Sequence, residues 1–160
     1  MVEQIIEEVK QKQAEINKLK KELHEKSKDS FFLGVKQIFN SCPDLKSVAW
    51  TQYTPYFADG DVCEFSAQTD YLEVNGDYDS KELEPEIVVS RGNWNNQTRK
   101  YEGRETKPNP DYNKSLADTL ENLSKFIGVF NEDFYKEQFG DHKRVVLTPD
   151  GIKVEEYEHD

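Results

Sequence analysis

The sequence contains few of the residues from which catalytic and structural sites are usually built. Its 160 residues include two cysteines, three histidines and one methionine. Cys42 and Cys63 are too few for a disulfide framework or a cysteine metal cluster, which favours a reduced, intracellular protein. A phosphate-binding glycine loop, a GxSxG turn, an HExxH helix and a CxxC pair are all absent from the sequence. We therefore expect no cofactor, and a protein that acts by binding more readily than by catalysis.

Long apolar segments are also missing. No run approaches the roughly 20 residues that span a bilayer, and the mean hydropathy is −0.91. The N-terminal segment MVEQIIEEVK is charged and has no apolar core, so it does not resemble a secretory signal. These features predict a cytoplasmic protein with no membrane partner.

Charge is abundant but unevenly distributed. The formal net charge is −11, and residues 59–86 carry ten acids against one lysine, a local charge of −9. Residues 91–107 reverse the sign, with five cations against two acids, or +3. An acidic chain repels nucleic-acid phosphates at long range. Direct binding of nucleic acid is therefore disfavoured, although the basic segment 91–107 does not allow it to be excluded.

Residues 2–26 have the pattern of a coiled-coil helix. Apolar residues recur at alternating three- and four-residue steps, interrupted only by Lys12, with no proline or glycine between them. The apolar positions are Val2, Ile5, Val9, Ile16, Leu19 and Leu23. Such a helix needs a partner for its stripe, because isolated helices are marginal in water. We expect residues 1–28 to form an oligomerisation arm that joins copies into a dimer or a higher homo-oligomer. The alternative is that this helix packs on the chain's own body.

Residues 29–160 predict an α+β globular domain. The residues from Ser27 to Asp29 are expected to interrupt the first helix, and Asp29 or Ser30 to cap a second one that ends before Pro43. Alternation and turn residues predict strands at 46–54, 62–67, 71–74 and 86–90 and a C-terminal hairpin about Pro149-Asp150-Gly151. Further helices are expected to begin near Ser115 and Asn131 and to end at Gly140.

Residues 93–110 show no periodicity and are predicted to form a long loop. The order of elements gives an antiparallel sheet with helices packed on one face, preceded by the coiled-coil-like N-terminal helix.

The stretch SVAWTQYTPYFADGDVCEF, residues 47–65, crowds aromatic and acidic side chains around a Thr-Pro corner. Aromatic rings can stack a planar ligand, which makes this corner a candidate ligand site through Trp50, Tyr53, Tyr56 and Phe57. Arg91, Arg99 and Arg104, with Trp94 among them, would meet the phosphate of a nucleotide-like or sugar-like ligand. The alternatives are that the first aromatics fill a core and that the second group lies on an ordinary exposed loop.

The acids of the same stretch suggest a weaker possibility. Asp59, Asp61 and Glu64 could hold Mg²⁺ or Ca²⁺, which prefer carboxylate ligands, and could then serve a metal-dependent hydrolase. The simpler interpretation of Asp59-Gly60-Asp61 is a solvated hairpin turn.

The motif WTQYTPYFADGD, followed by CEF, and the C-terminal sequence GDHKRVVLTPDGIKVEEYEHD resemble small uncharacterised proteins of tailed phages and some bacteria. The resemblance covers residues 30–75 and 110–160. It implies a viral or phage-accessory setting, inside the host cytoplasm, and it implies no catalytic residue.

With this setting, the acidic segment becomes a candidate partner-binding face through Asp77, Asp79, Glu82 and Glu84. The sequence therefore predicts a non-enzymatic accessory protein that self-associates and binds a host or viral protein. Such an acidic face can compete for the basic groove of a nucleic-acid or host-defence enzyme. A small-ligand binding protein is the second hypothesis.

Overall fold

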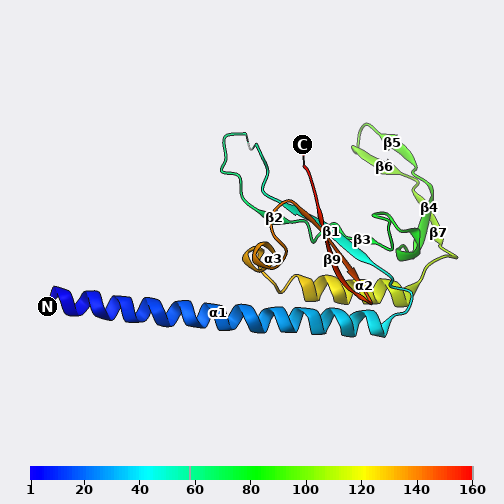
Figure 1. Ribbon diagram of the computed structural model, residues 1–160. Coiled ribbons are helices and arrows are strands. Elements are labelled where there is room, and N and C mark those ends of the chain that lie inside the picture. Colours follow the sequence, from blue (N-terminus) through cyan, green and yellow to red (C-terminus); the bar gives the residue numbers. More distant parts are fainter. Residues whose placement is uncertain (58, 160) are drawn as a thin grey trace.

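A long helix and a five-stranded antiparallel sheet organise the molecule, shown in Figure 1 as a computed structural model that describes residues 1–57 and 59–159. The helices are α1 (Val2–Ser41), α2 (Lys114–Ile127) and α3 (Glu132–Phe139), with the short 3-10 turn η1 (Lys81–Leu83). The strands are β1 (Val48–Tyr53), β2 (Ser66–Ala67), β3 (Glu73–Val74), β4 (Glu86–Ser90), β5 (Asn93–Asn95), β6 (Lys100–Glu102), β7 (Glu105–Pro108), β8 (Lys143–Thr148) and β9 (Gly151–Glu156).

Helix α1 is continuous, so the predicted break at Ser27 to Asp29 and the cap at Asp29 or Ser30 are wrong. Serine and aspartate are only modestly weaker helix formers than alanine, and no glycine or proline precedes Gly34. Because the helix is anchored on both sides of these residues, their small cost does not end it. The predicted end is confirmed: Cys42, which precedes Pro43, is extended with φ −140° and ψ 100°.

Strand β1 is the centre of the sheet. It pairs with β8 along one edge and with both β2 and β3 along the other, and β8 continues into β9. The predicted C-terminal hairpin is therefore confirmed, with Thr148 facing Gly151 across its turn. The predicted strand at 62–67 is shorter than expected, because only Ser66 and Ala67 pair with β1.

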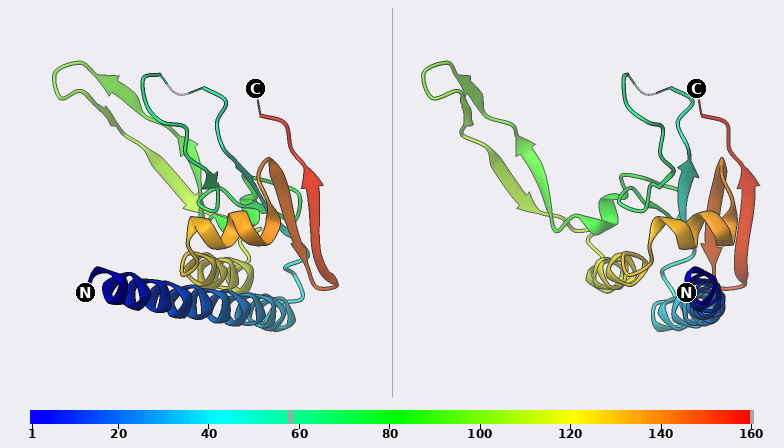
Figure 2. Two further views of the ribbon diagram at one scale, coloured as in Figure 1. Left: turned by 60° about the vertical axis from the view of Figure 1, so that its left-hand side comes forward. Right: turned by 90° about the vertical axis from the view of Figure 1, so that its left-hand side faces the viewer.

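One face of this sheet carries the core and all three helices, as the predicted α+β fold requires (Figure 2). The core-facing residues Val48, Trp50 and Gln52 of β1 and Val145 and Leu147 of β8 are buried at the two-residue period of a strand, and Ala49 between the first two is buried as well. The buried residues include Val48, Trp50, Val145 and Leu147 from the sheet and Phe31, Val35, Phe39, Leu116, Leu123, Ile127, Phe134, Tyr135 and Phe139 from the helices. Helices α1 and α2 approach closely at Gly34, where an added Cβ would lie 2.2 Å from the ring of Phe126.

Most of residues 93–110, predicted as a loop, instead form part of a two-stranded ribbon. Strand β4 pairs with β7, and β5 pairs with β6 beyond a kink, so that residues 86–108 make one projecting hairpin that we call the β-arm (Figure 2). Gly92 permits the kink, since its φ is +75° and a Cβ there would lie 2.1 Å from the Glu102 carbonyl oxygen. At the base, the buried Asn109 amide donates to the carbonyls of Lys81 and Glu84.

The helix caps were partly predicted. Asn131 accepts a hydrogen bond from the Phe134 amide at the start of α3, and Gly140 ends that helix with φ +91°, both as expected. The start of α2 differs, because Asn113 caps it instead of Ser115. The Asn113 side chain accepts a hydrogen bond from the Leu116 amide, so the helix starts two residues earlier than predicted.

The buried Gln52 ties the central strand to helix α3. Its Oε1 accepts from the Trp50 indole at 3.1 Å, while its Nε2 donates to the carbonyls of Tyr135 at 3.0 Å and Gly140 at 2.5 Å. Gln52 is fully buried, and every polar group of its amide has a partner. A satisfied buried amide fixes the elements that it joins more strictly than apolar packing does.

We predict that Gln52→Leu lowers the free energy of unfolding by about 2–4 kcal/mol, because it leaves three buried polar groups without partners. Urea unfolding followed by tryptophan fluorescence measures this change. Gln68→Leu is the matched control, since no side-chain hydrogen bond joins Gln68 to the rest of the described chain. Equal stabilities for the two variants would contradict the role assigned to Gln52.

Candidate functional site

Two segments that are far apart in the sequence meet just beyond the end of β1. The Thr54 amide donates to Oδ1 of Asp141 at 2.8 Å, and the Thr54 hydroxyl donates to Oδ2 at 2.6 Å. Beside this contact the ring of Tyr56 stacks on His142, with centroids 4.8 Å apart and planes 15° apart. The WTQYTPYF and GDHKR motifs therefore contact each other in the folded chain.

The C-terminal residues complete the cluster. The Tyr53 ring lies 4.1 Å from His159 and 5.8 Å from Tyr157, and the Tyr157 amide donates to the His142 carbonyl at 3.0 Å. We call Tyr53, Tyr56, His142, Tyr157 and His159 the tyrosine–histidine corner. The sequence predicted the two tyrosines, but the two histidines and Tyr157 were missed as members, because spacing along the chain does not show that the C-terminal segment returns to this place.

The charges at this corner are held in place by hydrogen bonds. Partial burial opposes ionisation of Asp141, but the hydrogen bonds from the Thr54 hydroxyl and amide and from the His142 amide outweigh it, so the pKa of Asp141 is lowered. His142 has a left-handed backbone with φ 53°, and its buried Nδ1 has no hydrogen-bond partner within the described residues. The left-handed backbone is one that histidine adopts more often than most residues, whereas the buried nitrogen without a partner costs stability.

Trp50 does not belong to an exposed ligand site. It is fully buried, its ring packs edge-on against Tyr135 and Phe139, and its indole is used by Gln52. The prediction that Trp50 binds a ligand is therefore wrong, and the residue belongs to the hydrophobic core. Tyr53 is half-buried, whereas Tyr56 and Phe57 are exposed at 71% and 80%, so the predicted aromatic group is divided among core, corner and surface.

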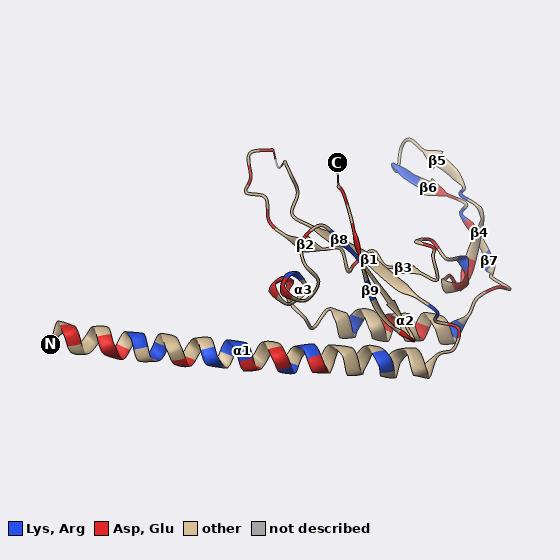
Figure 3. Ribbon diagram, in the orientation of Figure 1, with Lys and Arg blue, Asp and Glu red and all other residues tan. Residues whose placement is uncertain are grey.

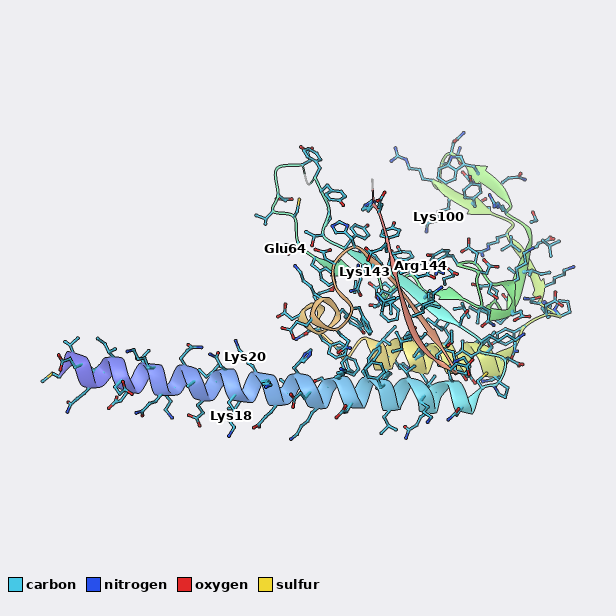
Figure 4. All side chains as sticks on the ribbon, viewed as in Figure 1. Lys18, Lys20, Glu64, Lys100, Lys143 and Arg144 are labelled. Carbon is cyan, nitrogen blue, oxygen red and sulfur yellow. The ribbon has the colours of Figure 1, made fainter. Side chains whose placement is uncertain are left out.

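The predicted metal ligands do not converge. Asp59, Asp61 and Glu64 are exposed on the connection between β1 and β2, where Figure 4 labels Glu64. Across residues 1–57 and 59–159, no group of three or more His, Cys, Asp or Glu side chains could hold a metal ion. The simpler interpretation of these acids as solvated loop residues agrees with their exposure.

Two of the four acids predicted to bind a partner, Asp77 and Glu82, line a polar hollow of about 420 Å³. Asp44, Asp77 and Glu82 line it, and Lys46 is the one cation beside them. Asp79 and Glu84 are exposed close by in sequence, and we call these five acids the acidic surface (Figure 3). Within the described part of the chain none of the five forms an ion pair with lysine or arginine, so their charges are available to a partner.

The predicted basic and aromatic residues lie together on the β-arm. Trp94 and Tyr101 are a cross-strand pair with centroids 5.1 Å apart, and both are exposed. Arg91, Arg104, Tyr101 and Val88 line a hollow of about 310 Å³, while Arg99 stands at the turn of the arm. The arm and the β1–β2 connection are separate projections, as the positions of Lys100 and Glu64 show in Figure 4. The structure therefore does not join the aromatic corner to the arginines in one site.

The first residues of α1 project from the body. Residues 1–23 are all exposed, including every apolar residue predicted for oligomerisation: Val2, Ile5, Val9, Ile16, Leu19 and Leu23. Contact with the body begins at His24, whose Nδ1 lies 2.9 Å from a Glu137 carboxylate oxygen. The alternative in which this helix folds back on its own body is wrong.

Comparison with known proteins gives no further assignment. No family model, curated protein or solved structure matches the chain. Across the described residues, no helix combines the length and the apolar character needed to cross a bilayer.

We predict that Asp141→Asn lowers the free energy of unfolding at pH 7 by about 1–2 kcal/mol, because a charge-assisted set of hydrogen bonds is lost. The pKa of Asp141 is lower in the folded chain than in the unfolded one. Its ionised form therefore stabilises the fold above the ordinary aspartate pKa, and this contribution is lost as the pH falls through the lowered value.

Denaturant unfolding at a series of pH values from about 7 to 2 tests this sign. The difference between the natural chain and Asp141→Asn should shrink toward zero at the acid end. Asp70→Asn, at an exposed acid, should change stability little at any pH. A difference for Asp141→Asn that does not depend on pH would refute the electrostatic account.

Proposed function

We propose that the protein is a non-enzymatic, phage-type accessory protein that self-associates through α1 and binds a host or viral protein through the acidic surface. The observation that carries this proposal is a set of five exposed carboxylates that form no ion pair with lysine or arginine in the described chain, three of which line one hollow. The N-terminal helix of the same body leaves an apolar stripe exposed. The phage setting follows from the resemblance of the WTQYTPYF and GDHKR motifs.

The partner would carry a basic patch. Unpaired carboxylates that stand close together create a negative potential, which steers a basic surface into place and speeds association. The hollow gives this surface a shape, so that a lysine or arginine side chain entering it would meet Asp44, Asp77 and Glu82 together. If the patch belongs to the groove of a nucleic-acid or host-defence enzyme, occupation of the groove would inhibit that enzyme.

Four amide substitutions test the acidic surface: Asp77→Asn, Asp79→Asn, Glu82→Gln and Glu84→Gln in one chain. We expect this variant to lose capture of a partner in affinity purification from host cells, because the substitutions remove four negative charges with little change in shape. Captured proteins are identified by mass spectrometry.

The matched control removes the same number of charges from another region, with Asp59→Asn, Asp61→Asn, Glu64→Gln and Asp70→Asn. The control should retain the partner that the first variant loses, and added salt should weaken capture by the natural chain. Retention of the same partner by both variants would remove the electrostatic basis of the proposal.

A second candidate function rests on the β-arm. Two guanidinium groups, a phenol ring and a valine side chain around one hollow suit a ligand with an anionic group and a planar body, such as a nucleotide. Arg91, Arg99, Lys100, Arg104 and Lys107 form no ion pair with any carboxylate in the described chain, so their charge is not neutralised internally.

We expect nucleoside triphosphates to raise the melting temperature of the natural chain by binding at this hollow. A ligand at 100 times its Kd adds about 2.7 kcal/mol to the free energy of unfolding. Arg91→Gln with Arg104→Gln should abolish the shift in a thermal-shift assay, whereas Lys107→Gln, outside the hollow, should preserve it. Absence of any shift with the natural chain would exclude this second candidate.

A further inference from the structure

The exposed stripe of α1 is available over a length that suits a helical partner. Residues 2–23, which we call the α1 extension, stand clear of the body in Figures 1 and 4. At 1.5 Å per residue they span roughly 33 Å. Figure 3 shows both acids and cations along the extension, and its five acids and five lysines cancel, so its polar sides carry no net charge.

The stripe and the body occupy different sides of α1. In the heptad repeat, Val2, Val9, Ile16 and Leu23 take position a, and Ile5 and Leu19 take position d. Phe31 and Val35, which pack into the body, fall at positions b and f of the same repeat. Leu33, the next apolar residue at position d, is exposed at 58% although the body has begun. A partner helix can therefore follow the stripe as far as Leu33 without displacing the body.

The residues beside the stripe distinguish the orientation of a second copy. Position g holds Glu8, Glu15 and Glu22, whereas position e holds Gln13 and Lys20. In a parallel pair, each g residue faces the e residue five positions later on the other helix. Glu15 then faces Lys20 of the second copy, and Glu8 faces its Gln13.

Ile6 supports the same orientation. It is apolar and 47% exposed, yet it lies at position e, outside the stripe. A parallel pair places it beside Met1 of the second copy, so that both apolar side chains are covered.

An antiparallel pair would instead bring position g against position g, with Glu15 facing Glu15 and Glu8 facing Glu22. Like charges at such positions are destabilising.

Lys12 argues for two strands over three or more. It is the one polar residue at a stripe position of the extension, and its ammonium group lies 3.1 Å from a Glu15 carboxylate oxygen. A two-stranded pair leaves the ends of such lysines in water, whereas a larger bundle encloses them. Where position d is leucine, as at Leu19, β-branched residues at position a such as Ile16 also favour two strands.

We propose that two copies of the chain pair their α1 extensions in parallel and in register, which places both globular bodies at the same end of a two-stranded coiled coil. This inference rests on the self-association already proposed and adds its partner, orientation and stoichiometry. It also means that both acidic surfaces and both β-arms are presented together.

Cross-linking at single positions tests the orientation. Leu19→Cys, made with Cys63→Ser, places identical thiols beside each other only in a parallel, in-register pair, so mild oxidation should convert most of the chain to a covalent dimer. Lys18→Cys in the same background is the matched control and should stay monomeric on a denaturing gel, since Lys18 lies outside the stripe. In an antiparallel pair Leu19 would lie opposite Val9, and only a mixture of Leu19→Cys and Val9→Cys chains would cross-link.

The outcomes test the three parts of the proposal separately: self-association, orientation and stoichiometry. Light scattering that shows a monomer for the natural chain would overturn self-association itself. A dimer that cross-links only in the Leu19→Cys and Val9→Cys mixture would overturn the parallel orientation alone, and a trimer would overturn the stoichiometry.

Charge exchange gives an independent readout. Lys20→Glu should weaken self-association roughly tenfold, because two attractive pairs become repulsive, and Glu15→Lys should do the same. Equimolar mixing of the two variants should restore association, since both contacts between positions 15 and 20 of the mixed pair are then attractive. One contact is the natural Glu15–Lys20 pair, and the other joins the two substituted positions with the signs exchanged. An unchanged dissociation constant for Lys20→Glu in sedimentation would contradict the predicted contact.

Discussion

The structure depends most on the way in which β1 holds the end of α3. Gln52 binds the carbonyls of Tyr135 and Gly140, and two residues later Thr54 binds the carboxylate of Asp141. Buried or partly buried hydrogen bonds of this kind allow one arrangement, because any shift leaves polar groups unpaired. The same contacts bring His142 beneath Tyr56 and lead the chain into β8 beside β1. The tyrosine–histidine corner is therefore a direct consequence of how the sheet receives the helix.

A consequence of packing all three helices on one face is that functional surfaces lie elsewhere. Aromatic residues of α1 and α3 fill much of the core. The α1 extension, the β-arm and the acidic surface therefore contribute little or nothing to it. Two-stranded ribbons and isolated helices are marginal in water. This chain keeps both, with exposed apolar side chains on each, and the proposed association would supply the stabilisation that these elements do not gain from the fold.

Local signals predicted the elements whose determinants are local. Pro149-Asp150-Gly151 sets a hairpin turn, Asn131 and Gly140 set the ends of α3, and each was read correctly from a few neighbouring residues. Strand β4 was predicted at 86–90, but β5, β6 and β7 were missed. These three strands are short and polar, and no period reveals that β4 pairs with β7 and β5 with β6 on the two sides of Gly92 and Gly103. The sequence left the role of Trp50 undecided between core and ligand site, because its burial depends on whether helices cover its face of the sheet. The contact between Thr54 and Asp141 spans 87 positions, a separation at which spacing carries no information about proximity.

Pairing of two copies changes what a surface of acids can achieve. An exposed ion pair contributes about 0–1 kcal/mol, so a few carboxylates on one body bind a basic partner weakly and lose most of that in salt. Two such surfaces fixed at one end of a coiled coil act on the same partner, and the second contact forms at a high effective concentration. Avidity of this kind can strengthen binding by 10²–10⁴ without any new contact. In the proposed function, the stripe of α1 and the charges around Asp77 and Glu82 would belong to one mechanism, because the orientation of the paired helices would decide whether the acidic surfaces can act together.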